Sequence, residues 1–74
     1  MDLSDSYRLL QQIVYDLANA EDGIGTGEFV LKYGVSRQLI AKYMNILSSA
    51  GIPIYQERKK HYLDPSYSVP FTLT

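Results

Sequence analysis

Hydrophobic residues recur every three or four positions along three stretches of the chain, and this spacing predicts three helices. The first is predicted from about Ser4 or Asp5 to Ala20. Its apolar stripe is formed by Leu9, Leu10, Ile13, Val14 and Leu17. The opposite side is mostly polar and carries Asp5, Arg8, Gln12, Asp16 and Asn19. We therefore expect a helix that faces a hydrophobic core on one side only.

The second predicted helix is short and begins near Thr26, which we expect to cap it. Glu28 follows in the first turn, near the positive end of the helix dipole. Phe29, Val30 and Tyr33 then recur at helical spacing. Gly34 ends the helix, because a tight turn between helices often needs a positive φ that glycine adopts readily.

The third predicted helix covers residues 36–49 and begins at Ser36, whose hydroxyl is a good N-cap. Its apolar side holds Val35, Ile40, Met44 and Leu47, and the residues that point away are Gln38, Ala41, Lys42 and Asn45. Two short helices joined by a glycine-containing turn form a helix-turn-helix layout. The alternative is that these are ordinary helices of a small domain, with surface charges that only face solvent.

The hydrophobic period changes to two after Gly51, which predicts a β-hairpin over residues 52–64 with a basic loop at residues 57–60. The expected register places Tyr55 opposite Tyr62 and Ile54 opposite Leu63. Pro53 restricts its strand to an edge or to its own first residues. Ile24, between two glycines, is a candidate for one short strand. We expect one domain over residues 1–65 and an extended tail or linker over residues 66–74.

Composition narrows the classes of function. The 74 residues are 46% hydrophobic and include no cysteine, so disulfides and thiolate metal sites are excluded. His61 is the only histidine, so neither a zinc site nor a histidine-based triad is expected. Gly23, Gly25 and Gly27 are followed by no Gly-Lys-Ser or Gly-Lys-Thr, and we interpret them as a flexible connection. We expect no catalytic residue, metal, cofactor or small-molecule ligand, no membrane segment, and a cytoplasmic protein.

Charge is divided unevenly along the chain, although the net charge is only −1. Residues 1–31 hold six acidic residues against one basic residue, a net −5, and residues 32–61 hold six basic residues against one acidic residue, a net +5. The third predicted helix lies in the basic half. A negatively charged partner is therefore expected on that side.

Three segments in this order resemble the winged helix-turn-helix domain at the N-terminus of bacterial transcription regulators of the WYL-domain and DeoR-type groups. They are GVSRQLIAKYMNIL (residues 34–47), SSAGIPI (48–54) and HYLDP (61–65). The resemblance implies a mainly α fold with a small β-hairpin, that is, three helices plus a wing. It also implies double-stranded DNA as the partner, a role in transcription regulation, and a following effector domain.

On this hypothesis the third helix enters the major groove and the hairpin lies on the adjoining backbone. The recognition-helix candidates are Ser36, Arg37, Gln38, Leu39, Lys42 and Asn45. Gln38 matches an adenine edge, Leu39 a thymine methyl group, and Arg37 and Lys42 guanine or phosphate. The wing and backbone candidates are Thr26, Gly27, Arg58, Lys59, Lys60 and His61.

A homodimer on two half-sites is expected, because a single module offers limited specificity. Of seven tyrosines, Tyr33 and Tyr43 are expected between helices, and Tyr7 or Tyr67 in a subunit interface. Two alternatives remain open. One is a protein–protein interaction adaptor that uses the acidic half of a winged-helix scaffold. The other is a small stand-alone repressor of a phage or mobile element.

Overall fold

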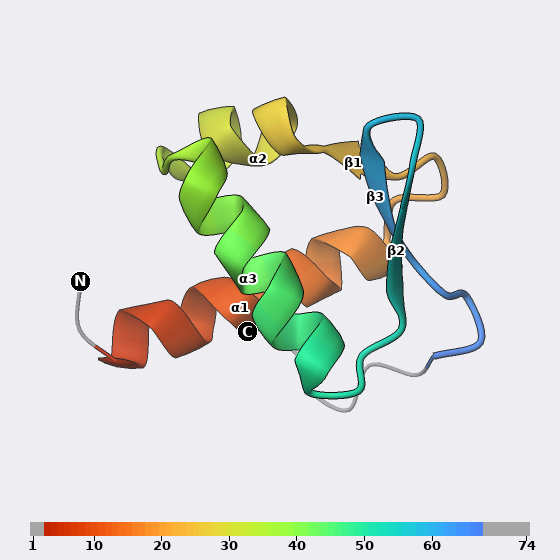
Figure 1. The fold of residues 1–74 in the computed structure, drawn as a ribbon, viewed down its shortest axis with the longest axis horizontal. Coiled ribbons are helices and arrows are strands. Elements are labelled where there is room, and N and C mark those ends of the chain that lie inside the picture. The colour runs from red at the N-terminus through yellow and green to blue at the C-terminus, as the bar shows by residue number, and fades with distance from the viewer. Residues whose placement is uncertain (1–2, 68–74) are drawn as a thin grey trace.

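The computed structural model describes residues 3–67 and consists of three helices and a small sheet (Figure 1). The elements are α1 (Leu3–Ala18), β1 (Ile24–Gly25), α2 (Thr26–Tyr33), α3 (Arg37–Ser49), β2 (Ile54–Glu57) and β3 (Lys60–Leu63). This confirms the mainly helical fold with a wing, including the short strand at Ile24. The first helix ends two residues earlier than predicted, because the chain already turns after Asn19, whose side-chain amide donates to the carbonyl oxygen of Tyr15 at 2.9 Å.

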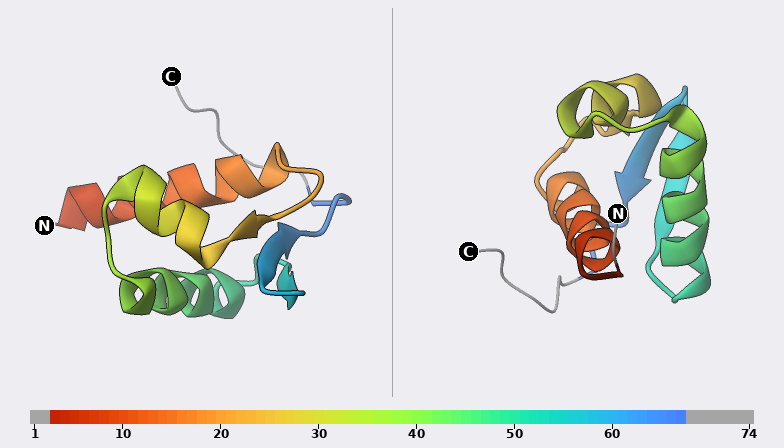
Figure 2. Two further views of the ribbon diagram at one scale, coloured as in Figure 1. Left: turned by 90° about the horizontal axis from the view of Figure 1, so that it is seen from above. Right: turned by 90° about the vertical axis from the view of Figure 1, so that its left-hand side faces the viewer.

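The apolar stripes of the three helices meet in one core. Ile13, Val14, Phe29 and Ile40 are its most deeply buried members, each at most 1% exposed. Tyr43 is buried between the helices and Tyr33 is partly buried against the core, as predicted. In Figure 2, left, α3 lies along one side of the molecule and α1 along the opposite side. The polar side of α3 therefore faces away from α1.

The turn between α2 and α3 has the predicted cap residues. Gly34 adopts φ 65°, and its N–H donates to the carbonyl oxygen of Val30 at 2.9 Å. The hydroxyl of Ser36 accepts from the N–H of Leu39 at 3.1 Å. These local bonds fix the angle at which the chain enters α3, because they satisfy backbone groups that the helix ends leave free.

The predicted cap of α2 is wrong. Gly25, not Thr26, occupies the N-cap position, and Thr26 is the first helical residue. The carboxylate of Glu28 accepts from the N–H of Gly25 at 3.3 Å. Because Gly25 also belongs to β1, the strand leads directly into the helix.

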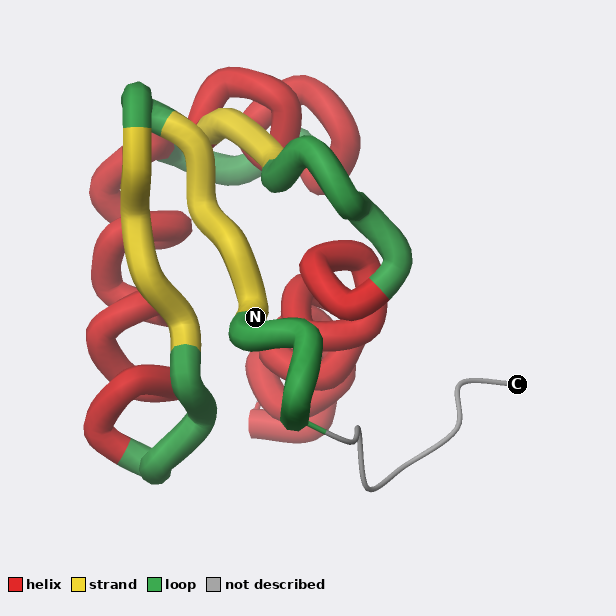
Figure 3. Tube along the Cα trace, turned by 90° about the vertical axis from the view of Figure 1, so that its right-hand side faces the viewer, coloured by secondary structure: helices red, strands yellow, loops and turns green. Residues whose placement is uncertain are grey.

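The three strands form an antiparallel sheet in the order β1-β3-β2. The predicted pairs Ile54–Leu63 and Tyr55–Tyr62 are both present. Pro53 stands just before β2, which is an edge strand, and its carbonyl oxygen accepts from the N–H of Asp64 at 2.9 Å. Figure 3 shows the three strands in yellow, with the β2–β3 turn at the top left of the view.

After β3 the chain turns instead of continuing extended. Asp64 Oδ1 accepts from the N–H and the hydroxyl of Ser66 at 2.9 and 2.8 Å. These bonds hold the pKa of Asp64 below its ordinary value. Tyr67 is partly buried against the core. The remainder of the predicted tail, residues 68–74, lies outside the described residues, so the domain boundary stays a prediction.

Candidate nucleic-acid interface

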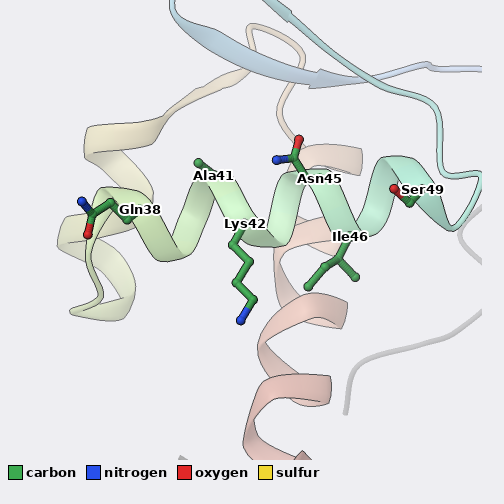
Figure 4. A pocket seen from close by; sticks show the side chains of 6 residues that line it. All are labelled: Gln38, Ala41, Lys42, Asn45, Ile46 and Ser49. Atoms are coloured by element: carbon green, nitrogen blue, oxygen red, sulfur yellow. The ribbon is translucent and has the colours of Figure 1, made fainter.

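The outer face of α3 presents the polar side chains that the helical spacing predicted. Gln38, Ala41, Lys42 and Asn45 are all exposed. Together with Ile46 and Ser49 they line a shallow hollow along the helix (Figure 4). Ala41 and Asn45 point to one side of this face and Lys42 and Ile46 to the other. The face combines amides, a cation and apolar surface, which are the groups that read base edges.

Arg37 and Gly27 come together although they belong to different helices. A β-carbon on Gly27 would lie 3.3 Å from Nη2 of Arg37, so the guanidinium rests against the first turn of α2. Glycine leaves room for this contact. Two predicted site residues, one from each helix of the motif, therefore form a continuous surface.

The cations of α3 are not used within the chain. Among the described residues the one ion pair joins Lys32 to Asp16 at 3.0 Å. Arg37 and Lys42 are exposed and have no carboxylate within ion-pair distance in that part of the chain. Their charge is therefore available to an external anion.

Ser36 and Leu39 have structural roles at the start of α3. The Ser36 hydroxyl is occupied by the N–H of Leu39, and Leu39 packs partly against the core. Leu39 is only partly exposed, whereas Gln38 and Asn45 are exposed, so less of the Leu39 side chain is accessible to a base. Contact of any of these side chains with DNA stays a prediction.

The turn of the wing is shorter than predicted. Glu57 pairs with Lys60 across the strands, so only Arg58 and Lys59 form the loop. Both are exposed and have positive φ, 53° and 68°. Two-residue hairpins with positive φ at both positions prefer Asn-Gly, since larger residues are strained there. Lys60 lies in β3 and is partly buried.

His61 does not lie at the tip of the wing, so its predicted position is wrong. The residue is 7% exposed, and its Nε2 lies 2.8 Å from the Oγ1 of Thr26. Its ring is tilted against Phe29, with the ring centres 6.4 Å apart. Burial lowers the pKa of His61, which favours the neutral ring. Thr26, at the first helical position, thus uses its hydroxyl to join α2 to β3.

The sequence contained the signal for this burial. Successive strand residues alternate between two faces, so the predicted position of Leu63 in the core places His61 on the same face. The short turn extends β3 back to Lys60, so His61 is the second residue of the strand. The contact of His61 with Thr26, 35 positions away, was not predictable in this way.

Gly23 is a second residue whose role the sequence did not reveal. It has φ 76°, and a β-carbon there would lie 2.7 Å from Cε1 of Tyr62 and 2.9 Å from the carbonyl oxygen of His61. Any other residue would therefore push β3 away. The glycine-containing connection before α2 is closely packed here, contrary to the expectation of a flexible connection.

Asp16 is not a solvated residue of α1 but joins α1 to α2. Its Oδ2 accepts from the Nζ of Lys32 and from the Tyr33 hydroxyl. Burial of the phenol, and then the bond to Asp16 and the carboxylate charge, raise the pKa of Tyr33. Lys32 thus neutralises part of the negative charge of residues 1–31 within the fold.

Within residues 3–67, His, Asp and Glu residues nowhere gather in threes in a way that would hold a metal ion. No helix in the same range has the length and apolarity needed to cross a membrane.

Residues 9–63 match the family described as HTH domain. The match runs from the middle of α1 to the end of β3 and covers more than half of the chain. No curated protein and no solved structure matches the chain. The matched family is one of DNA-binding domains and not of enzymes. With its three helices and small antiparallel sheet, the chain belongs to the helix-turn-helix domain family, in the winged form, and is a DNA-binding domain.

Proposed function

We propose that this domain binds double-stranded DNA sequence-specifically and regulates transcription, with α3 in the major groove and the β2–β3 hairpin on the adjoining backbone. The observation that carries the proposal is the outer face of α3, where Arg37 and Lys42 have no carboxylate partner among the described residues. A helix with unpaired cations and exposed amides is complementary to a groove lined by acceptors and phosphates.

Base recognition is assigned to the exposed amides. Gln38 and Asn45 each have the donor and acceptor needed for a bidentate contact with adenine, which discriminates by about 1–3 kcal/mol. Arg37, which lies against Gly27, approaches a phosphate together with the backbone N–H groups at the start of α2. Leu39 contributes at most an apolar contact.

The wing supplies backbone contacts through Arg58, Lys59 and Lys60. With Arg37 and Lys42, five cations are available once His61 is removed from the set. Neutralising about five phosphates gives a slope of about −4 to −5 for log K against log salt concentration.

A second copy is part of the proposal. One module of this size buries about 600–1,000 Å² on DNA, so useful specificity needs a dimer on two half-sites. The resemblance to bacterial WYL-domain and DeoR-type regulators supports a regulator in which another domain holds the two copies together.

The test is a titration of fluorescent duplex DNA at several salt concentrations. Duplexes selected from a random library by the wild-type chain supply the specific site. Arg37→Ala with Lys42→Ala is expected to weaken binding and to reduce the salt slope by about two. Arg8→Ala is the matched control, because Arg8 is exposed on the polar side of α1. It removes a positive charge without touching α3.

Two results would contradict the proposal: binding that does not depend on salt, or equal losses in the control and the double variant. Amide chemical shifts on adding DNA are expected to cluster on α3 and the wing. Shifts confined to α1 and to Glu21 and Asp22 in the loop after it, on adding a basic protein, would instead favour the adaptor.

A further inference from the structure

We propose that His61 is a positioning residue that fixes the wing for DNA binding by attaching β3 to the first turn of α2 through Thr26. The inference rests on the proposed function, because it assumes that the wing contacts DNA. It assigns to His61 a role opposite to that of a phosphate-binding cation.

The geometry places His61 where three parts of the domain meet. It pairs with Ile24 of β1 on one side and with Gln56 of β2 on the other. Its Nε2 lies 2.8 Å from Thr26 Oγ1 in α2, and its ring faces Phe29 in the core. A hollow beside the ring is bordered by Met44, Asn45 and Ser48 of α3. One side chain thus attaches the hairpin to α2, beside a hollow that α3 borders.

The buried side chains of the hairpin come from β3 alone. All four residues of β2 are exposed or only partly buried, whereas His61 and Leu63 are the buried residues of β3. β3 is therefore held at two points, by Leu63 near the base of the hairpin and by His61 nearer its turn. Arg58 and Lys59 precede His61 by three and two residues, so a rotation of β3 about Leu63 would displace them.

No charge compensates a protonated His61. Ile24, Gln56, Thr26, Phe29 and Asn45 face or border the ring, and none of them is ionisable. The charged residues on β3 and on the elements around it are Asp5, Arg8 and Asp16 of α1, Glu28 and Lys32 of α2, Arg37 and Lys42 of α3, Glu57 of β2 and Lys60 of β3. The ion pair found among the described residues joins Lys32 to Asp16 and does not involve the ring. The carboxylates of Asp16 and Glu28 are already bonded, to Lys32 with Tyr33 and to Gly25. Protonation therefore favours conformations in which the ring reaches water and the wing leaves α2.

The sign of the pH effect separates this role from that of a cation. A histidine that contacts phosphate would strengthen DNA binding as the pH falls from 7.5 to 5.8, because it gains charge. A positioning histidine weakens binding over the same range. His61 is the only histidine in the chain, so the change is assignable by comparison with His61→Gln, whose charge does not vary.

The first experiment measures duplex binding at constant ionic strength for the wild-type chain and His61→Gln at both pH values. We expect wild-type affinity to fall about two- to tenfold, corresponding to the loss of one hydrogen bond, and the variant to change much less. A rise in wild-type affinity on acidification, or no change, would overturn the inference. Absence of DNA binding at pH 7.5 would instead refute the proposed function itself.

The second experiment uses Thr26→Val, which removes the hydroxyl and keeps the shape. It is expected to weaken binding by a similar factor, and Thr26→Ser, which restores a hydroxyl, should recover most of the loss. Repeating Thr26→Val in an Arg58→Ala, Lys59→Ala background is decisive. If Thr26 acts by positioning these cations, the further loss disappears there, so the effects are not additive.

Additive losses would overturn the inference, because they would mean that Thr26→Val weakens the domain independently of the wing. Thermal unfolding of each variant shows whether it remains folded at the assay temperature. If Thr26→Val unfolds, the pH comparison on the unaltered chain still decides between the two signs.

Discussion

Two of the turns that need left-handed backbone in this domain meet that need in opposite ways. The turn between α2 and α3 places Gly34 at φ 65°. The turn of the wing places Arg58 at φ 53° and Lys59 at φ 68°. Residues with a β-carbon lose about 1–2 kcal/mol in this region, whereas glycine loses little. The interhelical turn is thus built for stability, and the wing keeps cations at positions where they are strained. Such strain points to a role outside folding.

The two regions also differ in their anchorage. Ile40, Tyr43, Met44 and Leu47 bury one side of α3 in the core. The wing is anchored mainly through β3, because β2 has no buried residue. Many apolar contacts therefore place α3, whereas few place the wing, and variants should affect the two regions differently.

The largest expected effect is on the helical core. Phe29→Ala, at a residue that is 0% exposed and packs on Tyr33 and His61, should reduce the free energy of unfolding by about 3–5 kcal/mol. Leu31→Ala in the same helix is the control, since Leu31 is 87% exposed and should change stability by less than about 0.5 kcal/mol. Urea denaturation measures both. Similar losses would mean that α2 is not packed as described.

A change of opposite sign is expected at the turn of the wing. Arg58→Asn with Lys59→Gly relieves the left-handed strain and should raise the free energy of unfolding by about 1–2 kcal/mol. The same variant should reduce the salt slope of DNA binding by about two. Arg58→Ala with Lys59→Ala removes the same charges but keeps β-carbons. It should therefore reduce the salt slope by the same amount without raising the free energy of unfolding. A less stable Asn-Gly variant would contradict the strain.

The interhelical turn offers the reverse case with a smaller effect. Gly34→Ala should lower the free energy of unfolding by about 1 kcal/mol. No atom lies within 4 Å of the added β-carbon, so this loss comes from the backbone alone. Gly34→Asn should lose less, because asparagine tolerates the left-handed region better. If both variants were as stable as the wild type, Gly34 would not be needed for its φ.

The smallest expected effect is the pH dependence of stability through His61. Burial lowers the pKa of His61 in the folded state below the unfolded value of about 6.5. The unfolded chain therefore binds the proton more tightly. Stability is complete above about pH 6.5 and falls as the pH decreases from there toward the lower, folded pKa. Thermal melts at pH 7.5 and 5.5 should show a decrease for the wild type and a smaller one for His61→Gln. Equal decreases would exclude His61 as the cause.

Local patterns determined most of this architecture. The helical spacing of apolar residues predicted the buried sides of all three helices, and Gly34 and Ser36 took the conformations expected of them. The alternation around Tyr55 and Tyr62 predicted the hairpin register. These features depend on residues that are close in sequence or directly opposite, so the chemistry of a short segment is sufficient to specify them.

The tertiary structure decided which polar groups serve the fold and which remain free. Thr26, Asp16 and His61 were each expected to face solvent or DNA or to cap a helix, and instead they join elements 16 or more positions apart in sequence. Arg37 and Lys42 remained exposed and without an ion-pair partner among the described residues. The spacing of polar residues in the sequence is the same whether a side chain faces water or bonds to a residue far away in the chain. Only the packing of the sheet against the helices brings such partners within hydrogen-bond distance and leaves the outer face of α3 uncovered.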